Sequence, residues 1–346
     1  MMDSITEIVS GIYQLQVPIP NNPLGFTLPY LIKGSEGTIL IDTGVPAPPA
    51  REALDEQLKA LVEPGDLLIL AITHAHPDHS GLAGMVKELA PQVKVAIHKD
   101  DWSDMKEFQD RVRGGNVTGW RDQMIKHALD NGFPEEEVEE AAQRMMIPRR
   151  AEDSDQVHRP VSFIEEPDIL MEGGENLSNG SFALEAIHTP GHSPGHLCFY
   201  EKEKKIMFTG DHVLPVITSN VSIRPGSLDS PLESYVASLD KIANKKVDIV
   251  CPAHEEVFYD LKGRITALHQ HHDKRLDAVA DAVGDTSKNG YEIAESVPWD
   301  VGAWAEMDAG LRRAALGETL AHLEVLVRQG RVQELGDMNP IRFALI

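Results

Sequence analysis

The chain has 346 residues, 42% of them hydrophobic, which is the composition of a folded protein with a sizeable core and predicts about two domains. Its 55 acidic and 32 basic side chains give a formal charge of -23, which argues against nucleic acid or an anionic membrane as a partner. Two cysteines, Cys198 and Cys251, are too few for a disulfide framework, and we expect both to be buried free thiols.

Targeting signals are the next feature to consider. Residues 1–20 lack the basic region and apolar region of a signal peptide, and the sequence contains no apolar run long enough to cross a bilayer. We therefore expect a cytoplasmic protein without a membrane partner.

The N-terminal part alternates short apolar runs with turns, which predicts strands at "GIYQLQVPI", "FTLPYLIKG", "TILIDTG" and "LLILAIT". The last two runs are apolar throughout, as expected of strands that are buried on both faces. Helices are predicted near residues 51–61 and over "SGLAGMVKELAP", where Ser80 lies near the N-cap, and "KVAIHK" predicts the next strand. The pattern indicates a layered α/β fold.

Between about residues 100 and 168 the pattern changes to acidic helices, as in "DMKEFQDRV" and "PEEEVEEAAQRMM". We interpret this segment as a helical insertion that caps a site, with Trp120, Met124, Met145 and Met146 able to line an adaptable pocket. A solvated helical decoration without a role is the alternative.

Strands resume at "FALEAIHT", "HLCFYEKEKKIMFTGD" and "VDIVCPAH", with a helix at "PLESYVASLDKIAN" between the last two. After about residue 261, two short helices, a longer amphipathic helix and a short strand pattern predict a winged-helix module. Residues 262–346 carry ten basic and 13 acidic side chains, so we expect this module to serve packing or dimerisation rather than DNA reading.

The stretch "THAHPDH" places His74, His76, Asp78 and His79 in a turn that follows a predicted buried strand. Ligands bind at the carboxyl ends of strands in α/β sheets. Positions i and i+2 point their imidazoles the same way, while Asp78 and His79 turn to another side after Pro77, so the cluster could serve two metal ions.

Two ions need more ligands, and the later strands supply them. His192 lies in "HTPGHSPGH", Asp211 in "MFTGD" and His254 in "IVCPAH", each in a turn after a strand. Imidazole and carboxylate donors suit zinc, with iron or manganese as alternatives. The sequence therefore predicts two Zn²⁺ ions as cofactors.

Taken in order, "THAHPDH", "TPGHSPGH", "FTGDH" and "CPAH" resemble the motif series of the metallo-β-lactamase superfamily over about residues 8–260. The resemblance implies an α/β fold of the four-layer αββα sandwich type. We accordingly expect a catalytic domain at residues 1–260, with the helical insertion at about 100–168, and a winged-helix-like domain at residues 261–346.

The resemblance also implies a role for each candidate ligand. His74, His76 and His192 would bind the first ion, Asp78, His79 and His254 would bind the second, and Asp211 would bridge both. Asp42 in "LIDTG" matches a position that supports the ligands, because metal-bound imidazoles need an oriented partner.

Within the superfamily, the complete ligand set with a histidine at position 76 resembles the glyoxalase-II-like hydrolases, whereas flavodiiron relatives usually carry Glu there. The tail "GETLAHLEVLVRQGRV" resembles the C-terminal module of the lactamase-beta-like subgroup, which includes thioester hydrolases and RNA endonucleases. We expect an EC 3.1 hydrolase with a small acyl substrate and leave a homodimer open.

The implied mechanism is attack by a metal-bridging hydroxide on a carbonyl thioester, ester or lactone. Asp78 would orient this nucleophile and take its proton, and His212, beside Asp211, is a candidate to face the substrate. The motifs offer no obvious general acid for a poor leaving group, which favours thioesters and lactones over β-lactams.

Two other functions stay open at this point. One is a metal-dependent phosphodiesterase or endoribonuclease of the same fold, against which the acidic chain argues. The other is a non-catalytic winged-helix regulator with a metal sensor site.

The sequence contains several further histidines for which we expect roles other than metal binding. We expect His188 to be a strand-end residue near the site rather than a ligand, and His196 either to support the ligands or to close its turn. His269, His271 and His272 are expected to lie on a solvated helix face, because they lack acidic or cysteine partners at ligand spacing.

Overall fold

The computed structural model describes residues 4–113, 117–138, 164, 166–336 and 338–346. The chain divides into two compact units, unit 1 and unit 2. Unit 1 comprises residues 1–109, 158–219 and 238–265, and unit 2 comprises residues 110–157, 220–237 and 266–346. The boundary near residue 260 stays a prediction.

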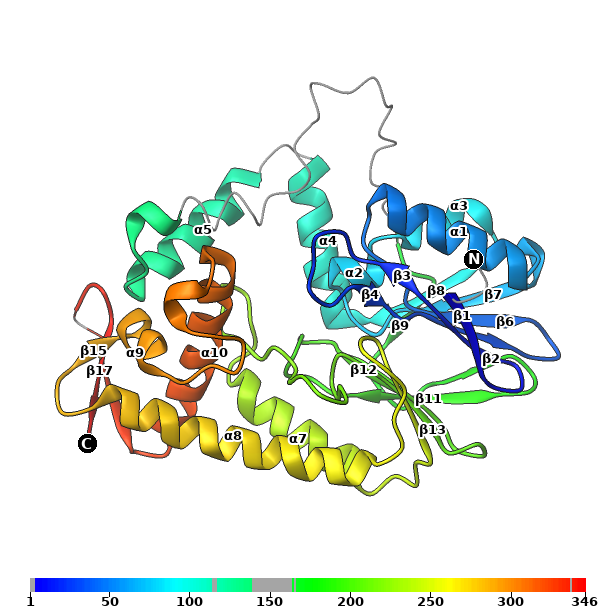
Figure 1. The fold of residues 1–346 in the computed structure, drawn as a ribbon. Coiled ribbons are helices and arrows are strands. Elements are labelled where there is room, and N and C mark those ends of the chain that lie inside the picture. The colour runs from blue at the N-terminus through cyan, green and yellow to red at the C-terminus, as the bar shows by residue number, and fades with distance from the viewer. Residues whose placement is uncertain (1–3, 114–116, 139–163, 165, 337) are drawn as a thin grey trace. The chain divides into compact units, whose positions relative to one another are not determined.

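Unit 1 is built around two mixed sheets (Figure 1). The first has the order β1 (Ile5–Val9), β2 (Ile12–Leu15), β5 (Tyr30–Lys33), β6 (Thr38–Ile41), β7 (Leu67–Ala71), β8 (Lys94–His98), β9 (Ile169–Met171). The second has the order β10 (Asn176–Ser178), β11 (Ala183–His188), β12 (Leu197–Glu201), β13 (Ile206–Gly210), β14 (Ile249–Pro252). The first is parallel from β6 to β9, and the second is parallel between β13 and β14. A small hairpin joins β3 (Val17–Pro18) to β4 (Phe26–Thr27).

The helices that begin in unit 1 lie between these strands in the sequence, except for α8, which follows the last of them. They are α1 (Pro48–Leu61), the 3-10 turn η2 (Pro64–Asp66), α2 (Pro77–Ser80), α3 (Ala83–Leu89), α4 (Lys99–Arg113) and α8 (Leu261–Val283). Helix α7 (Pro231–Ala243) begins in unit 2 and ends in unit 1. The predicted strands and the helix at residues 51–61 are thus confirmed.

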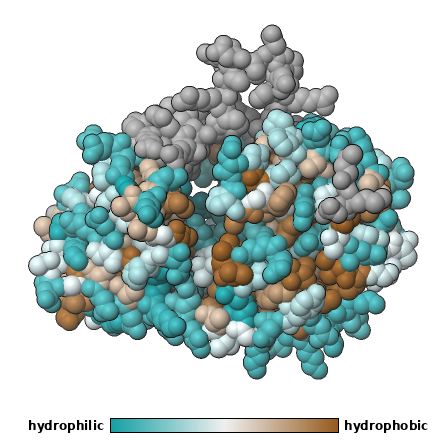
Figure 2. All heavy atoms as spheres, in the orientation of Figure 1, coloured by the Kyte–Doolittle hydropathy of each residue, from teal (hydrophilic) through white to brown (hydrophobic). Residues whose placement is uncertain are grey.

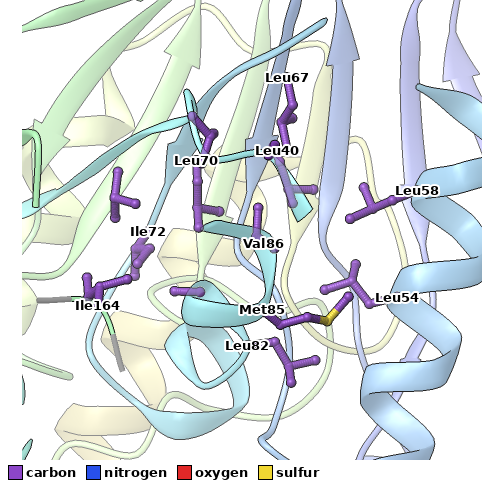
Figure 3. Packing of buried hydrophobic residues seen from close by; sticks show 14 of the residues in the cluster. Leu40, Leu54, Leu58, Leu67, Leu70, Ile72, Leu82, Met85, Val86 and Ile164 are labelled. Carbon is purple, nitrogen blue, oxygen red and sulfur yellow. The ribbon is translucent and has the colours of Figure 1, made fainter. Parts of the chain in front are cut away.

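Alternating side chains of the first sheet supply two separate cores. Leu40 and Leu70 pack with Leu54 and Leu58 of α1 on one face (Figure 3). On the other face, Ile39, Ile41 and Ala71 pack with Phe199 and Phe208 of the second sheet. Because β6 and β7 are covered on both faces, their sequences contain no polar alternation.

Ser80 lies near the N-cap of α3, as predicted, but it is the last residue of α2 and does not itself cap α3. The helical pattern breaks at Gly81 and Leu82, and Leu82 is the N-cap of α3 without a side-chain hydrogen bond. The Ser80 hydroxyl instead donates to the carbonyl oxygens of Ala75 and His76, at 3.0 and 3.1 Å. These two hydrogen bonds join the end of α2 to the start of the histidine motif.

Both cysteines are buried free thiols, as predicted. Burial raises the pKa of Cys198 to about 12 and also raises that of Cys251. Neither thiol is therefore ionised near neutral pH.

Unit 2 contains the helices and strands of the C-terminal module. Its further elements are α5 (Val117–Asp130), β15 (Lys288–Asn289), α9 (Gly290–Ser296), the 3-10 turn η3 (Trp304–Glu306), α10 (Ala309–Arg328), β16 (Val332–Leu335) and β17 (Arg342–Leu345). The three strands have the order β15-β17-β16. Val279, Val283, Leu316 and Leu323 belong to a core of this unit's own.

Two expectations for this region need correction. The first C-terminal helix, α8, has 23 residues rather than being short. His272 on α8 is only 3% exposed, and its Nδ1 lies 3.2 Å from Nε2 of His322, so the solvated helix face is wrong for His272. His269 and His271 are half-buried.

The described part of the predicted cap contains the helices α4 and α5. Met124 is buried and Trp120 is half-buried, whereas Met145 and Met146 lie outside the described residues. The role of the cap stays a prediction.

None of the described helices is both long and apolar enough to cross a membrane. The face of the molecule shown in Figure 2 is mostly hydrophilic, with hydrophobic residues in separate groups.

Candidate metal centre

All seven predicted ligands lie in unit 1, just after the carboxyl ends of strands. Four of them follow the buried strand β7, and Pro77 begins α2, which turns the second half of "THAHPDH" away from the first. His192 follows β11, Asp211 directly follows β13, and His254 follows β14. The first sheet therefore supplies one half of the site and the second sheet the other half.

His74, His76, His192 and Asp211 form a first group, in which one ligand atom of each residue lies within 4.8 Å of the others. Nδ1 of His76 is 3.0 Å from Nε2 of His74 and 2.9 Å from Nε2 of His192. A neutral imidazole has one N–H, so three facing ring nitrogens cannot all be satisfied by one another. A cation between them would satisfy all three.

Asp78, His79 and His254 form a second group of the same kind. Oδ2 of Asp78 lies 3.6 Å from Nε2 of His79 and 3.5 Å from Nε2 of His254. The Nε2 atom of each of these histidines is buried and has no hydrogen-bond partner among the described residues. Buried polar atoms of this kind need a partner, and a metal ion fits these donors.

Asp211 lies between the two groups. Its Oδ2 is 3.5 Å from Nε2 of His192, while its Oδ1 is 3.4 Å from Nε2 of His79 and 3.3 Å from Nε2 of His254. Oδ1 is a further buried atom without a hydrogen-bond partner in the described part of the chain. The two oxygens thus face different groups, as a bridging ligand requires.

In His79 and His254 the second ring nitrogen, Nδ1, has a hydrogen-bond partner that orients the ring. Nδ1 of His79 lies 2.9 Å from Oδ2 of Asp42, and Nδ1 of His254 lies 3.0 Å from the carbonyl oxygen of Phe26. Because both partners are acceptors, each Nδ1 carries the proton and each Nε2 presents a lone pair to the centre. This contact gives Asp42 the supporting position that its motif predicts.

Thr73 orders the ring of His74 in the same way. Its hydroxyl donates to Oδ2 of Asp42 at 2.7 Å and therefore accepts from Nδ1 of His74 at 3.0 Å. The hydroxyl of Ser219 lies 3.2 Å from Nδ1 of His192. Thr73, Phe26 and Ser219 could not be predicted from the sequence, because a backbone carbonyl and isolated hydroxyls carry no motif.

Electrostatics act differently on different ligands. Burial would lower the pKa of His79 and His254, but the carboxylate of Asp211 outweighs it and raises both pKa values, so a bound cation would displace a proton from these rings. His74 and Asp211 are held in binding-competent forms. Burial, together with the nearby rings of His79, His76 and His192, lowers the pKa of His74 well below its ordinary value, so His74 is neutral. Burial alone would raise the pKa of Asp211, but the rings of His79 and His254 outweigh it and hold that pKa well below its usual range. Asp211 is therefore a carboxylate.

His196 is fully buried beside the centre and links two ligand loops. Its Nδ1 lies 2.9 Å from the hydroxyl of Thr189, and its Nε2 accepts the backbone N–H of Asp211 at 3.2 Å. Of the two roles considered for His196, support of a ligand is the one that these contacts favour.

His212 has no exposed surface, and burial lowers its pKa to about 3. The catalytic role expected of His212 stays a prediction. Because its side chain is fully buried, the mechanism proposed below does not use it.

A third cluster of potential ligands consists of His98, Asp100 and His188. Nδ1 of His98 accepts the backbone N–H of Asp100 at 3.2 Å, and Nε2 of His188 donates to the carbonyl oxygen of Pro194 at 2.9 Å. The two rings are stacked, with centroids 4.1 Å apart. Since backbone groups engage these nitrogens, His188 fits the expected strand-end residue rather than a ligand.

Comparison with known proteins places this geometry in a family. The model of the family described as "Metallo-beta-lactamase superfamily" matches residues 22–254. The chain belongs to the metallo-beta-lactamase superfamily. The α/β fold with mixed sheets and the His/Asp clusters that suit divalent metal are those of a hydrolase of this superfamily.

Curated relatives of this metallo-beta-lactamase superfamily protein include the "Probable metallo-hydrolase YqjP" of Bacillus subtilis. It is 23% identical over 335 residues, which are 95% of this chain and 96% of that protein. The "Acyl-coenzyme A thioesterase MBLAC2" of Gallus gallus is 27% identical over 66% of this chain and 72% of its own length. The "Atrochrysone carboxyl ACP thioesterase dmxR1" of Cryptosporiopsis sp. is 37% identical, but the match spans 32% of this chain and 30% of that protein.

Solved structures of the superfamily match over nearly the whole chain. The metallo-beta-lactamase family protein TTHA1429 from Thermus thermophilus superimposes with a TM-score of 0.76 at 28% identity, covering 98% of this chain and 100% of that one. A beta-lactamase domain protein from Burkholderia ambifaria gives a TM-score of 0.77 at 22% identity, covering 99% of this chain and 95% of that one. The second likeness concerns the fold alone.

Proposed function

We propose that the chain is a binuclear metal-dependent hydrolase of a carbonyl thioester, ester or lactone, of EC 3.1 type. The observation that carries this proposal is the meeting of two His/Asp groups at Asp211, whose two carboxylate oxygens face different groups. The relatives named as thioesterases support an acyl substrate.

In this proposal each group holds one ion. His74, His76 and His192 would hold the first ion, Asp78, His79 and His254 would hold the second, and Asp211 would contribute to both. The set of imidazoles and carboxylates favours zinc, with iron or manganese as alternatives. When bound, such ions would polarise the acyl carbonyl and make a nucleophile available at neutral pH.

Asp78 is the residue that we assign to proton transfer. Its side chain is 23% exposed, against 12% for Asp211, so it is the carboxylate of the centre that solvent reaches more easily. Its Oδ2 faces His79 and His254, which leaves Oδ1 to orient an attacking water and accept its proton.

The need for a proton on the leaving group favours a thioester over an amide as the substrate. A thiol has a pKa of about 8.5 and departs as the thiolate without a general acid. An amide nitrogen needs a proton donor, and His212, the ionisable residue next to Asp211, is buried and neutral. We therefore place thioesters, and after them lactones, ahead of β-lactams.

For the C-terminal part we propose a winged-helix-like domain at residues 261–346, after a catalytic domain at residues 1–260. The order helix, strand, helix, helix, strand, strand from α8 to β17, with the sheet order β15-β17-β16, supports this topology. Its excess of acidic side chains favours packing or dimerisation as its role.

The test is metal analysis of the purified protein, followed by a substrate screen with and without added zinc. The screen contains acyl-coenzyme A thioesters, lactones, β-lactams, bis-p-nitrophenyl phosphate and RNA. We expect hydrolysis of thioesters or lactones, and a loss of at least about 100-fold in kcat/KM for Asp211→Ala because the shared ligand is gone.

The control is Asp248→Ala, which removes an exposed carboxylate of the same unit that pairs with Lys205. This variant should keep the wild-type rate. Cleavage of phosphodiesters alone would overturn the proposal, and so would full thioesterase activity in Asp211→Ala.

A further inference from the structure

Asp101 lies in the first turn of α4, and its carboxylate is fully buried. Acidic side chains in a first turn commonly interact with the N-terminus of their own helix. The carboxylate of Asp101 instead accepts three hydrogen bonds from two distant segments of unit 1. The donors are the N–H of Ala75 at 2.8 Å, the hydroxyl of Ser193 at 2.8 Å and the N–H of Gly195 at 2.5 Å.

The three hydrogen-bond donors lie next to predicted metal ligands in the sequence. Ala75 stands between His74 and His76, and Ser193 directly follows His192. One carboxylate therefore holds both segments that supply the three imidazoles of the first group. These segments come from different sheets and are also joined by a backbone hydrogen bond from Leu197, the first residue of β12, to the carbonyl oxygen of Thr73 at 2.8 Å. Asp101 lies beyond that bond, against the turns that carry the imidazoles.

The close approach of the second segment depends on glycine at position 195. A Cβ atom there would lie 2.7 Å from the backbone nitrogen of Asp101, 2.7 Å from Nδ1 of His98 and 2.8 Å from Oδ1 of Asp101. Real Cβ atoms essentially never approach that closely. The loop is therefore seated directly against the carboxylate.

Burying a carboxylate is costly unless it is fully hydrogen-bonded, and charge-assisted hydrogen bonds are stronger than neutral ones. Three donors from two loops satisfy Asp101. An amide at this position would direct an N–H₂ group at one of those donors and lose at least one hydrogen bond.

We infer that Asp101 is a positioning residue for the three-histidine group, which sets the distance of His192 from His74 and His76 and so determines how tightly the first ion is held. This inference rests on the metal centre of the proposed function. Mutation of residues that orient metal ligands typically lowers metal affinity by about 10- to 100-fold.

The experiment compares zinc binding to the metal-free full chain by competition with a chromophoric chelator. Three variants are used with the wild type: Asp101→Asn, Ser193→Ala and Asp100→Asn. Asp100 is the matched control, because it is the neighbouring carboxylate in the same helical turn but is 48% exposed and pairs with His98 rather than with the N–H groups of Ala75 and Gly195.

We expect Asp101→Asn to bind one of the two ions about 10- to 100-fold more weakly. Ser193→Ala keeps the carboxylate and loses one of its donors, so it should weaken binding by a few-fold, and Asp100→Asn should bind like the wild type. Excess zinc should restore the hydrolytic rate of Asp101→Asn, because the residue positions ligands and does not touch the substrate.

The inference is overturned if folded Asp101→Asn binds both ions with wild-type affinity, even if its melting temperature falls, since a purely structural role would have that result. If Asp101→Asn does not fold, Ser193→Ala decides, and wild-type zinc affinity in that variant also overturns the inference. A wild type that binds no zinc contradicts both this inference and the proposed function. Normal zinc binding without acyl hydrolysis contradicts the proposed function alone.

Discussion

The side chains behind the ligands decide which nitrogen each imidazole presents. Asp42 accepts the backbone N–H of Thr73 with Oδ1, and its Oδ2 accepts the hydroxyl of Thr73 and lies 2.9 Å from Nδ1 of His79. The hydroxyl of Thr73 then accepts from His74. A single buried carboxylate thereby determines the tautomer of one histidine in each metal group.

Replacing Asp42 with Asn should therefore disturb both groups. The amide provides one acceptor oxygen where the carboxylate provides two, so either Thr73 or His79 loses its partner. We expect about 10- to 100-fold weaker zinc binding and a loss of about 1–3 kcal/mol in the free energy of unfolding. Chelator competition and urea unfolding measure these two changes.

Asp55→Asn provides the comparison for this prediction, because Asp55 forms a surface ion pair with Lys59 on α1. Such a pair contributes at most about 1 kcal/mol. Equal zinc affinity in the two variants would show that Asp42 does not orient the ligands.

At the scale of elements, the end of β13 approaches its neighbours without room for a side chain. Gly210 has φ +50, and a Cβ atom there would lie 2.7 Å from Nε2 of His196 and 3.0 Å from Cβ of Thr73. The next residue is Asp211, so this strand end determines where the shared ligand lies.

Gly210→Ala should consequently cost stability and metal affinity together. Overpacking typically costs about 1–3 kcal/mol, and a left-handed φ adds strain for alanine. Thermal unfolding and zinc titration of the variant measure both effects. Gly65→Ala should change neither, because nothing lies within 4 Å of a Cβ at Gly65, and a Gly210→Ala variant with unchanged zinc affinity would contradict the prediction.

Helices α8 and α10 of unit 2 bring two buried histidines together. Burial, with His322 and His271 nearby, lowers the pKa of His272 to about 2, and burial lowers that of His322 to about 4. Because both pKa values lie below the ordinary value of about 6.5, the unfolded chain takes up protons first as the pH falls. Stability is thus fully present above about pH 6.5 and is lost on acidification below it.

The variant His272→Phe keeps a ring beside Tyr235 and removes one of these titrating groups. We expect the loss of unfolding free energy between pH 7 and pH 5 to be smaller in this variant by about 2 kcal/mol. Urea unfolding at the two pH values measures it. Burial raises the pKa of Glu318 to about 7, so Glu318 titrates in the opposite sense, but it is present in both proteins and cancels in the comparison. An unchanged pH dependence would contradict the prediction.

On the scale of the whole molecule, the two units have separate cores, and every proposed ligand belongs to unit 1. A ligand that binds only the native state stabilises it by about 2.7 kcal/mol at a hundred times its dissociation constant. Metal binding should therefore protect unit 1 and leave unit 2 unchanged.

Hydrogen exchange with zinc and with a chelator tests this expectation. Zinc should slow exchange in β7 and β13 by up to about 100-fold, while β16 and β17 exchange at the same rate in both conditions. Equal protection of β16 and β17 would show that the metal also stabilises unit 2.

The ligands could be predicted from the sequence because each follows a recognisable buried strand, and the carboxyl ends of such strands gather ligands. Asp101 could not be predicted in this way. Its partners lie 26, 92 and 94 residues away, and two of the three are backbone N–H groups, which any residue type provides. The burial of His272 was missed for a similar reason, since its partner His322 is 50 residues distant on another helix.

The division of the ligands between two sheets also has a mechanical consequence. An ion held by His74 and His192 would join positions 118 residues apart, in a chain whose two cysteines are buried free thiols that form no disulfide. Closing so long a loop removes conformational freedom from the unfolded chain, as a covalent cross-link does. The metal centre would then be a reversible cross-link. The supply of metal would set both the reactivity of the protein and the lifetime of its folded state.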